Sequence, residues 1–433
     1  MNFSEATEYL NSRVMFGIKL GLDNVSEILK LLNNPQDELN FIHLAGTNGK
    51  GSTASLLNAG LINADAKVGL FTSPHLISVR ERIRINGEAV SETIFAEEMT
   101  KLSKGVKDYP ELQPTYFETT ALLAILVFKR LNCDFVIWET GMGGRLDATN
   151  VVTPVITAIT NCALDHCAYL GETIEEIASE KGGIIKPGVP IFYGGNNEVV
   201  RHILLQIASE KAAPFNFRGN DFFIHNYDFT ENGMITEIGF QTGENIQVET
   251  KLWGRHQADN ASLAAVILRY LSFITDLNFG RMLTGMNNAQ WPGRLQQLDV
   301  VTDTLTFVDG AHNAHAAQGL VNSLNHRFKH KKWHVLIGIL EDKDCKEFLK
   351  IIDKSADSYT ILPVNNPRTA KPEQLKQTIN AIAPEKSVNI GSIADIKSYL
   401  KNDTIITGSL YLIGDILKQL TTEEIPRVLN HAW

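Results

Sequence analysis

The sequence has few cysteines, no long apolar run and no excess of positive charge. Only 4 cysteines occur in 433 residues, and none of them forms a C-x-x-C pair, which favours a reducing cytoplasm. The longest apolar run, Ala121 to Phe128, is too short to cross a bilayer, and no signal peptide is expected at the start. A net charge of -9 argues against a general nucleic-acid or membrane-surface binder, although local groups can still hold anionic ligands.

Short apolar segments alternate with helical patterns along most of the chain. A hydrophobic fraction of 44% and a length of 433 residues predict a globular protein with two or three domains. This alternation predicts an α/β fold with a parallel sheet covered on both faces. Strands are expected at 41–45, 67–71, 133–138, 155–160, 190–194, 306–308, 335–339, 360–364 and 404–407.

A glycine-rich stretch follows the first of these strands. It comprises Gly46, Thr47, Asn48, Gly49, Lys50, Gly51 and Ser52. Its backbone N–H groups, the start of the next helix and the lysine charge predict a phosphate-binding loop. The strict template G-x-x-x-x-G-K-[ST] does not fit, because Ala45 and Gly51 stand where it requires a glycine and a hydroxyl. The alternative is an ordinary glycine-rich turn with a surface lysine.

Three polar side chains stand at or just beyond the ends of predicted strands. They are Ser73, Glu139 and His166. Ligands gather at the carboxyl edge of open α/β sheets, and a hydroxyl, a carboxylate and an imidazole there suit Mg²⁺ and phosphate oxygens. Each also has a structural alternative: Ser73 as a cap, Glu139 as a surface acid and His166 as a core histidine.

Arginines alternate with other residues from Val79 to Ile85. A strand here would place Arg80, Arg82 and Arg84 on one face. That face is expected either to line a site for an acidic substrate or to form a solvated sheet edge.

The second half of the chain changes its pattern twice. Residues 215–252 predict short antiparallel strands, and the segment Trp291 to Arg294 combines proline and glycine in the manner of a domain hinge. A new α/β series follows it. We therefore expect an ATP-binding domain at 1–292 and a smaller α/β domain at 293–433, with a reaction cleft between them.

Taken together, these motifs resemble the folylpolyglutamate synthase/dihydrofolate synthase family of the Mur ligase superfamily. Further motifs occur in the family's order: Gly141 to Asn150, Leu164-Asp165-His166, Glu180 to Lys186, Gly254 to Gln257 with Asn260, and Asp309 to Asn313. The resemblance implies a P-loop mononucleotide-binding domain with a small antiparallel sheet, followed by a smaller Rossmann-like domain. It also implies a cytoplasmic monomer.

The resemblance implies a reaction and its partners. ATP phosphorylates a carboxylate, and the amine of L-glutamate then displaces phosphate from the acyl phosphate. The acceptor is a folate in one activity of the family and dihydropteroate in the other. Neither nucleic acid nor a membrane takes part.

The resemblance also implies residue roles. Lys50 and the loop amides hold the β- and γ-phosphates, Ser73 and Glu139 bind one Mg²⁺, and His166 binds a second. Lys181 matches a lysine that is carbamylated in the family, and Arg80 and Arg82 are expected at the substrate. The residues that match positions gripping ATP across the cleft are Asn260, Arg294, Asp309 and His312.

Some positions depart from the family's pattern. They are Cys167 and Ala168 after the metal-binding histidine, Ala314, and Ala121. None of them removes a proposed phosphate or metal group. Two other hypotheses stay open: a related ligase that acts on a different carboxylate, and a nucleotide-binding regulatory protein without turnover.

Overall fold

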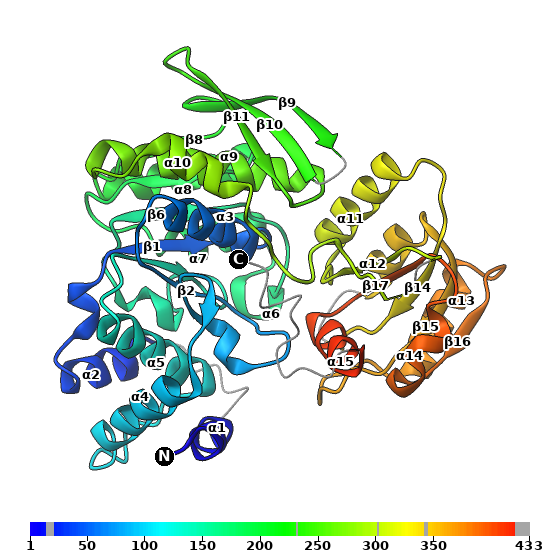
Figure 1. Cartoon of the computed structure of the whole chain (residues 1–433), viewed down its shortest axis with the longest axis horizontal. Coiled ribbons are helices and arrows are strands. Elements are labelled where there is room, and N and C mark those ends of the chain that lie inside the picture. Colours follow the sequence, from blue (N-terminus) through cyan, green and yellow to red (C-terminus); the bar gives the residue numbers. More distant parts are fainter. Residues whose placement is uncertain (14–20, 231–232, 301–302, 342–344, 421–433) are drawn as a thin grey trace.

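The chain folds around two large β-sheets and one small one. We analysed a computed structural model, which describes residues 1–13, 21–230, 233–300, 303–341 and 345–420 (Figure 1). The first sheet has eight strands in the order β4-β3-β2-β5-β1-β6-β7-β8. Its strands are β1 (Phe41–Ala45), β2 (Val68–Phe71), β3 (Ile83–Ile85), β4 (Glu88–Ala89), β5 (Phe135–Glu139), β6 (Ile156–Ile159), β7 (Ile191–Tyr193) and β8 (Phe215–Phe217).

Helices cover both faces of this sheet, which confirms the predicted layering. They are α1 (Phe3–Asn11), α2 (Asp23–Leu31), α3 (Lys50–Asn63), α4 (Glu92–Gly105), α5 (Tyr116–Arg130), α6 (Cys167–Leu170), α7 (Ile174–Gly182), α8 (Glu198–Glu210), α9 (Arg255–Ile274) and α10 (Phe279–Met286), together with the 3₁₀ turns η1 (Pro35–Glu38) and η3 (Ala148–Val151). Strand β1 is buried along its whole length, as expected of a central parallel strand.

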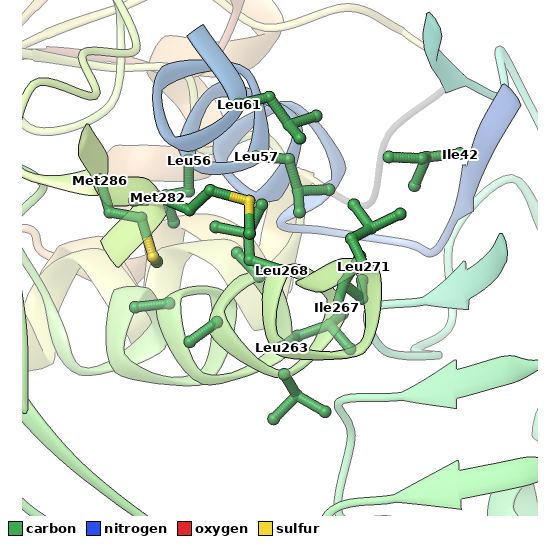
Figure 2. Packing of buried hydrophobic residues seen from close by; sticks show 14 of the residues in the cluster. Ile42, Leu56, Leu57, Leu61, Leu263, Ile267, Leu268, Leu271, Met282 and Met286 are labelled. Atoms are coloured by element: carbon green, nitrogen blue, oxygen red, sulfur yellow. The ribbon is translucent and has the colours of Figure 1, made fainter. Parts of the chain in front are cut away.

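Alternate side chains of β1 enter two different cores. Ile42 and Leu44 pack with α3, α9 and α10, whereas Phe41 packs with α5 on the opposite face. Figure 2 shows the first of these cores, which contains Ile42 together with leucines of α3 and α9 and methionines of α10. Burial on both sides fixes the register of β1, and with it the position of the loop that follows.

The segment 215–252 only partly matches the prediction of antiparallel strands. The strands β9 (Phe222–Thr230), β10 (Gly233–Phe240) and β11 (Asn245–Thr250) do form a small antiparallel sheet. Strand β8, however, pairs in parallel with β7 of the main sheet. The reason is that helix α8 connects β7 to β8, and such a crossover returns the chain in the parallel direction.

The predicted strand from Val79 to Ile85 is wrong in its first half. Val79–Arg82 forms a 3₁₀ turn (η2), and only Ile83–Ile85 is a strand. A capping box causes this turn: the Ser78 hydroxyl accepts from the Arg80 N–H, and the Glu81 carboxylate accepts from the Ser78 N–H at 2.6 Å.

Because of this turn, the three arginines do not share one face. Arg80 donates to the Val90 carbonyl, and Arg82 donates to Nδ1 of His75 at 2.9 Å. Arg84 is buried and donates to backbone carbonyls, including that of Gly87.

The second large sheet has six strands in the order β12-β13-β17-β14-β15-β16. They are β12 (Gln296–Gln297), β13 (Thr306–Asp309), β14 (Trp333–Ile337), β15 (Ala356–Ile361), β16 (Val388–Ile390) and β17 (Thr404–Thr407). Around them lie α11 (Ala314–Arg327), α12 (Cys345–Ile352), α13 (Pro372–Ile382), η4 (Ile393–Asp395), α14 (Ile396–Tyr399) and α15 (Leu410–Leu420). The division of the chain at 292/293 stays a prediction. Among the described helices, none is long and apolar enough to cross a membrane.

Candidate active site

A cleft of about 390 Å³ lies between the two large sheets. The loop after β1 forms one wall. Gly49 in this loop has φ of +86°, and a Cβ added there would lie 2.3 Å from Oδ1 of Asn260. A Cβ on Gly51 would lie 2.5 Å from the Trp291 ring. Both positions therefore require glycine, because the loop is closely packed against α9 and the predicted hinge.

Hydrogen bonds from the end of β6 hold this loop. The Thr160 hydroxyl donates to the Asn48 carbonyl at 2.7 Å, and Asn161 Oδ1 accepts from the Asn48 N–H at 3.1 Å. The ammonium group of Lys50 curls back and donates to the Gly46 carbonyl at 2.9 Å. The loop is thus preorganised around a positive charge at the start of α3, which suits phosphate.

Ser73 and Glu139 lie together beside the loop. The Ser73 N–H donates to Oε2 of Glu139 at 3.1 Å. Burial raises the pKa of the Glu139 carboxyl, while Lys50, the Ser73 N–H and Arg294 act in the opposite direction. A hydroxyl and a carboxylate that line one cleft are hard oxygen donors, as Mg²⁺ prefers.

Lys181 enters the same cleft from α7. Its side chain is almost fully buried, and burial, followed by the nearby charge of Lys50, lowers its pKa to about 8. A Cβ on Gly144 would lie 2.9 Å from the Lys181 carbonyl, so the glycine-rich segment 141–144 packs directly on this end of α7. Lys181 is therefore a buried amine whose pKa lies well below that of an exposed lysine.

The far wall of the cleft comes from the second sheet. Asp309 at the end of β13 accepts the N–H groups of Leu295 and Ala311 at 2.8 and 2.9 Å. Nδ1 of His312 donates to the Gly310 carbonyl at 2.7 Å. Burial lowers the pKa of Arg294, and Asp309 and Glu139 counteract that effect. The guanidinium thus lies between two acidic groups, one from each wall.

Polar side chains connect the two walls directly. Asn48 of the phosphate loop donates to Nδ1 of His315 at 3.0 Å. Asn313 donates to Oδ2 of Asp165 at 3.0 Å and to Oδ1 of Asn48 at 3.3 Å. The described conformation therefore has its cleft bridged at one side.

The structure brings nearly all of the predicted site residues together. Those that line the cleft are Gly46, Thr47, Asn48, Gly49, Lys50, Gly51, Ser52, Ser73, Glu139, His166, Lys181, Asn260, Arg294, Asp309 and His312. The two expected substrate residues, Arg80 and Arg82, are not among the lining residues, because η2 turns them toward Val90 and His75.

Several lining residues had no predicted role. Thr160 ends a predicted strand and Asn161 follows it, and this position was the signal that would have identified them. Arg218 and Asp259 form an ion pair at 2.5 Å in the cleft, but they are 41 residues apart and no motif links them.

Comparisons with known proteins agree with this geometry. The family described as "Mur ligase middle domain" matches residues 44–268, and "Mur ligase, glutamate ligase domain" matches residues 293–408. The fold is thus that of a Mur-type ligase. A dihydrofolate synthase/folylpolyglutamate synthase of Bacillus subtilis is 34% identical, over 96% of this chain and 99% of its own length. The chain belongs to the folylpolyglutamate synthase/dihydrofolate synthase family.

Solved structures show the same similarity. A folylpolyglutamate synthase of Mycobacterium tuberculosis, complexed with ADP and AMPPCP, superimposes with a TM-score of 0.89 at 26% identity, covering 97% of this chain and 98% of that one. A bifunctional folylpolyglutamate synthase/dihydrofolate synthase of Yersinia pestis, complexed with AMPPNP and a manganese ion, superimposes with a TM-score of 0.83 at 28% identity. The match covers 97% of this chain and 98% of that one.

Proposed function

We propose that this protein is an ATP-dependent ligase that joins L-glutamate to a folate-type carboxylate through an acyl phosphate. The observation that carries the proposal is the cleft, in which a phosphate loop, a Ser73–Glu139 pair and Lys181 face Arg294 and Asp309. The family of the chain supports the substrates, because its relatives are named for folate and dihydrofolate synthesis. The acceptor is then tetrahydrofolate with its glutamate tail, dihydropteroate, or both.

The reaction has two steps. A carboxylate oxygen of the acceptor attacks the γ-phosphorus of ATP, and ADP leaves. The amine of L-glutamate then attacks the carbonyl carbon, inorganic phosphate leaves with the C–O bonding electrons, and the amine loses a proton. The protein's main task is to position the reactants and neutralise charge on the transferring phosphoryl group.

Two cations of the cleft suit that task. Lys50 lies at the start of α3 in the phosphate loop, and Arg294 approaches from the other wall. In the proposed complex, Lys50 contacts the β- and γ-phosphates, while the guanidinium of Arg294 binds two γ-phosphate oxygens at once. Asn260, Asp309 and His312 complete the ATP contacts.

The residues present fit Mg²⁺. Ser73 and Glu139 would hold one ion, which would neutralise phosphate charge when bound. This set holds only one carboxylate, and that is enough because Mg²⁺ usually keeps waters and phosphate oxygens as its other ligands. His166 would hold a second ion. An imidazole alone is a poor partner for Mg²⁺, so this second site depends on additional negative charge nearby.

A carbamate on Lys181 would supply that negative charge. The side chain is buried in the cleft wall with a lowered pKa, and an uncharged amine is the form that reacts with CO₂. Carbamylation replaces a cation close to Lys50 by an anion. It therefore removes a repulsion and creates a group that attracts metal.

An acceptor panel tests the proposed function. Purified protein is given ATP, Mg²⁺ and L-glutamate with tetrahydrofolate, dihydropteroate or a non-folate carboxylate, and ADP and the amide product are measured. We expect ADP and amide in equal amounts with at least one folate-type acceptor. Turnover with the non-folate acceptor alone would support the related-ligase alternative, and absence of ATP turnover with all acceptors would support a regulatory protein.

We further propose that the enzyme works as a monomer in the cytoplasm.

A further inference from the structure

A chain of three buried polar side chains lies behind the cleft wall. It begins at His43 of β1, passes through Thr149 of η3 and ends at Asp147. Nε2 of His43 lies 2.9 Å from the Thr149 hydroxyl, which lies 2.5 Å from Oδ1 of Asp147. His43 and Thr149 are 0% exposed, so both side chains are shielded from bulk solvent.

The direction of each hydrogen bond follows from the groups involved. Both oxygens of Asp147 accept backbone N–H groups, from Thr149 at 3.0 Å and from Met142 at 2.8 Å. Since Asp147 acts as the acceptor, the Thr149 hydroxyl donates its one proton to it. The hydroxyl must then accept from His43, which therefore carries its proton on Nε2. In the described part of the chain Nδ1 of His43 has no hydrogen-bond partner, as suits an unprotonated nitrogen.

His43 keeps this form across the physiological range. Burial, and to a smaller extent the charge of Lys186, lowers its pKa to about 3. A neutral imidazole with a fixed tautomer donates one hydrogen bond in a constant direction. The chain is therefore suited to hold a position, and not to move protons.

What the chain holds is the glycine-rich segment that supports Lys181. Asp147 fixes the N–H of Met142, three residues after Glu139. The same segment rests on α7, where the Arg145 N–H donates to the Glu180 carbonyl at 2.8 Å. The added Cβ of Gly144 would lie 2.8 Å from the Glu180 carbonyl, so this segment packs directly against the backbone of α7.

We infer that His43 and Thr149 are positioning residues, which act through Asp147 to set the cleft wall around Lys181 for catalysis. The inference rests on the proposed role of Lys181. Neither side chain touches the reactants in this account. Their effect is on the placement of the segment between Glu139 and Lys181, so they should alter turnover more than ATP binding.

Two matched pairs of variants test the inference. Thr149→Val keeps the shape and removes the hydroxyl, whereas Thr149→Ser keeps the hydroxyl. His43→Leu removes the donor, whereas His43→Gln keeps one near the position of Nε2. We expect Thr149→Val and His43→Leu to lower kcat by about 10- to 100-fold, as loss of supporting hydrogen bonds around a site commonly does. The KM for ATP should change by less than about threefold, and Thr149→Ser and His43→Gln should recover most of kcat.

A second measurement separates positioning from plain stability. The ¹³C carbamate signal of Lys181, measured with labelled bicarbonate, should weaken in Thr149→Val and recover in Thr149→Ser. A lowered unfolding temperature with unchanged kcat and carbamate signal would overturn the inference, as would equal activity within both pairs. If Thr149→Val does not fold, the comparison of His43→Leu with His43→Gln tests the inference. Failure of the proposed role of Lys181 is distinguishable, because Lys181→Ala would then keep normal turnover.

Discussion

Carbamylation of Lys181 gives the most detailed prediction. The reaction needs the uncharged amine, and burial beside Lys50 lowers the pKa of this lysine from 10.5 to about 8. At pH 7 about one tenth of the amine is then uncharged, compared with about 0.03% for an ordinary exposed lysine, a gain of roughly 300-fold. The environment of Lys181 therefore favours reaction with dissolved CO₂.

The sign of the pH dependence follows directly. Raising the pH through about 8 removes the proton from Lys181 and favours the carbamate, whereas lowering the pH protonates the amine and disfavours it. We expect a ¹³C carbamate signal that grows from pH 6.5 to 9, and turnover that falls in CO₂-free buffer and returns when bicarbonate is added.

The size of the activity loss is set by electrostatics. In the proposed complex, Lys181→Ala removes a group that acts on the transferring phosphoryl charge, and losses of one such electrostatic group cost about 10²- to 10³-fold in kcat. Short carboxylates such as acetate should restore part of it. Lys30, which is 62% exposed in its side chain, is a matched control, and Lys30→Ala should behave as the parent protein. Unchanged turnover after CO₂ removal, together with absence of any carbamate signal on Lys181, would refute this reasoning.

Three further predictions follow from the cleft and its borders. Lys50→Met should lower kcat by about 10²-fold or more while the unfolding temperature stays within a few degrees, and a near-normal rate would contradict its phosphate role. Gly49→Ala should cost about 1 to 3 kcal/mol of unfolding free energy, measured by urea denaturation, because φ is +86° and the new methyl would meet Asn260; an unchanged midpoint would contradict this. The guanidinium of Arg327 lies 3.5 Å from the centre of the Trp253 ring, so Arg327→Met should lower the unfolding free energy, measured by urea denaturation, by about 1 kcal/mol, and an unchanged value would contradict this.

The phosphate loop could be predicted from residues that are close together in the chain. A buried strand, three glycines, a lysine and a helix start are neighbours in the chain, so their spacing alone predicted a loop of this kind, although Thr160 and Asn161 hold its shape in the folded chain. The same holds for Ser73, Glu139 and His166. Glu139 ends β5, Ser73 and His166 come after β2 and β6, and parallel strands end at one edge of a sheet. The alternation of strands and helices likewise determined the α/β class.

Contacts between distant segments lay beyond such patterns. The arginine segment had strand-like alternation, but the Ser78–Glu81 capping box turns it into η2, and Arg80 and Arg82 do not line the cleft. Strand β8 has a sequence pattern like that of its antiparallel neighbours, but it pairs in parallel with β7. In both cases the alternating sequence pattern only weakly favoured the predicted strand arrangement, and hydrogen bonds in the folded chain favoured another one.

The sequence by itself determined the fold class and the chemical groups of the cleft, because these depend on residues that are close in the chain. Only the tertiary structure decided which buried groups support them. His43 and Thr149 are 106 residues apart, and nothing in their spacing joins them. The shift in the pKa of Lys181 likewise arises from burial and from Lys50 on another helix, and burial is a property of the folded chain alone.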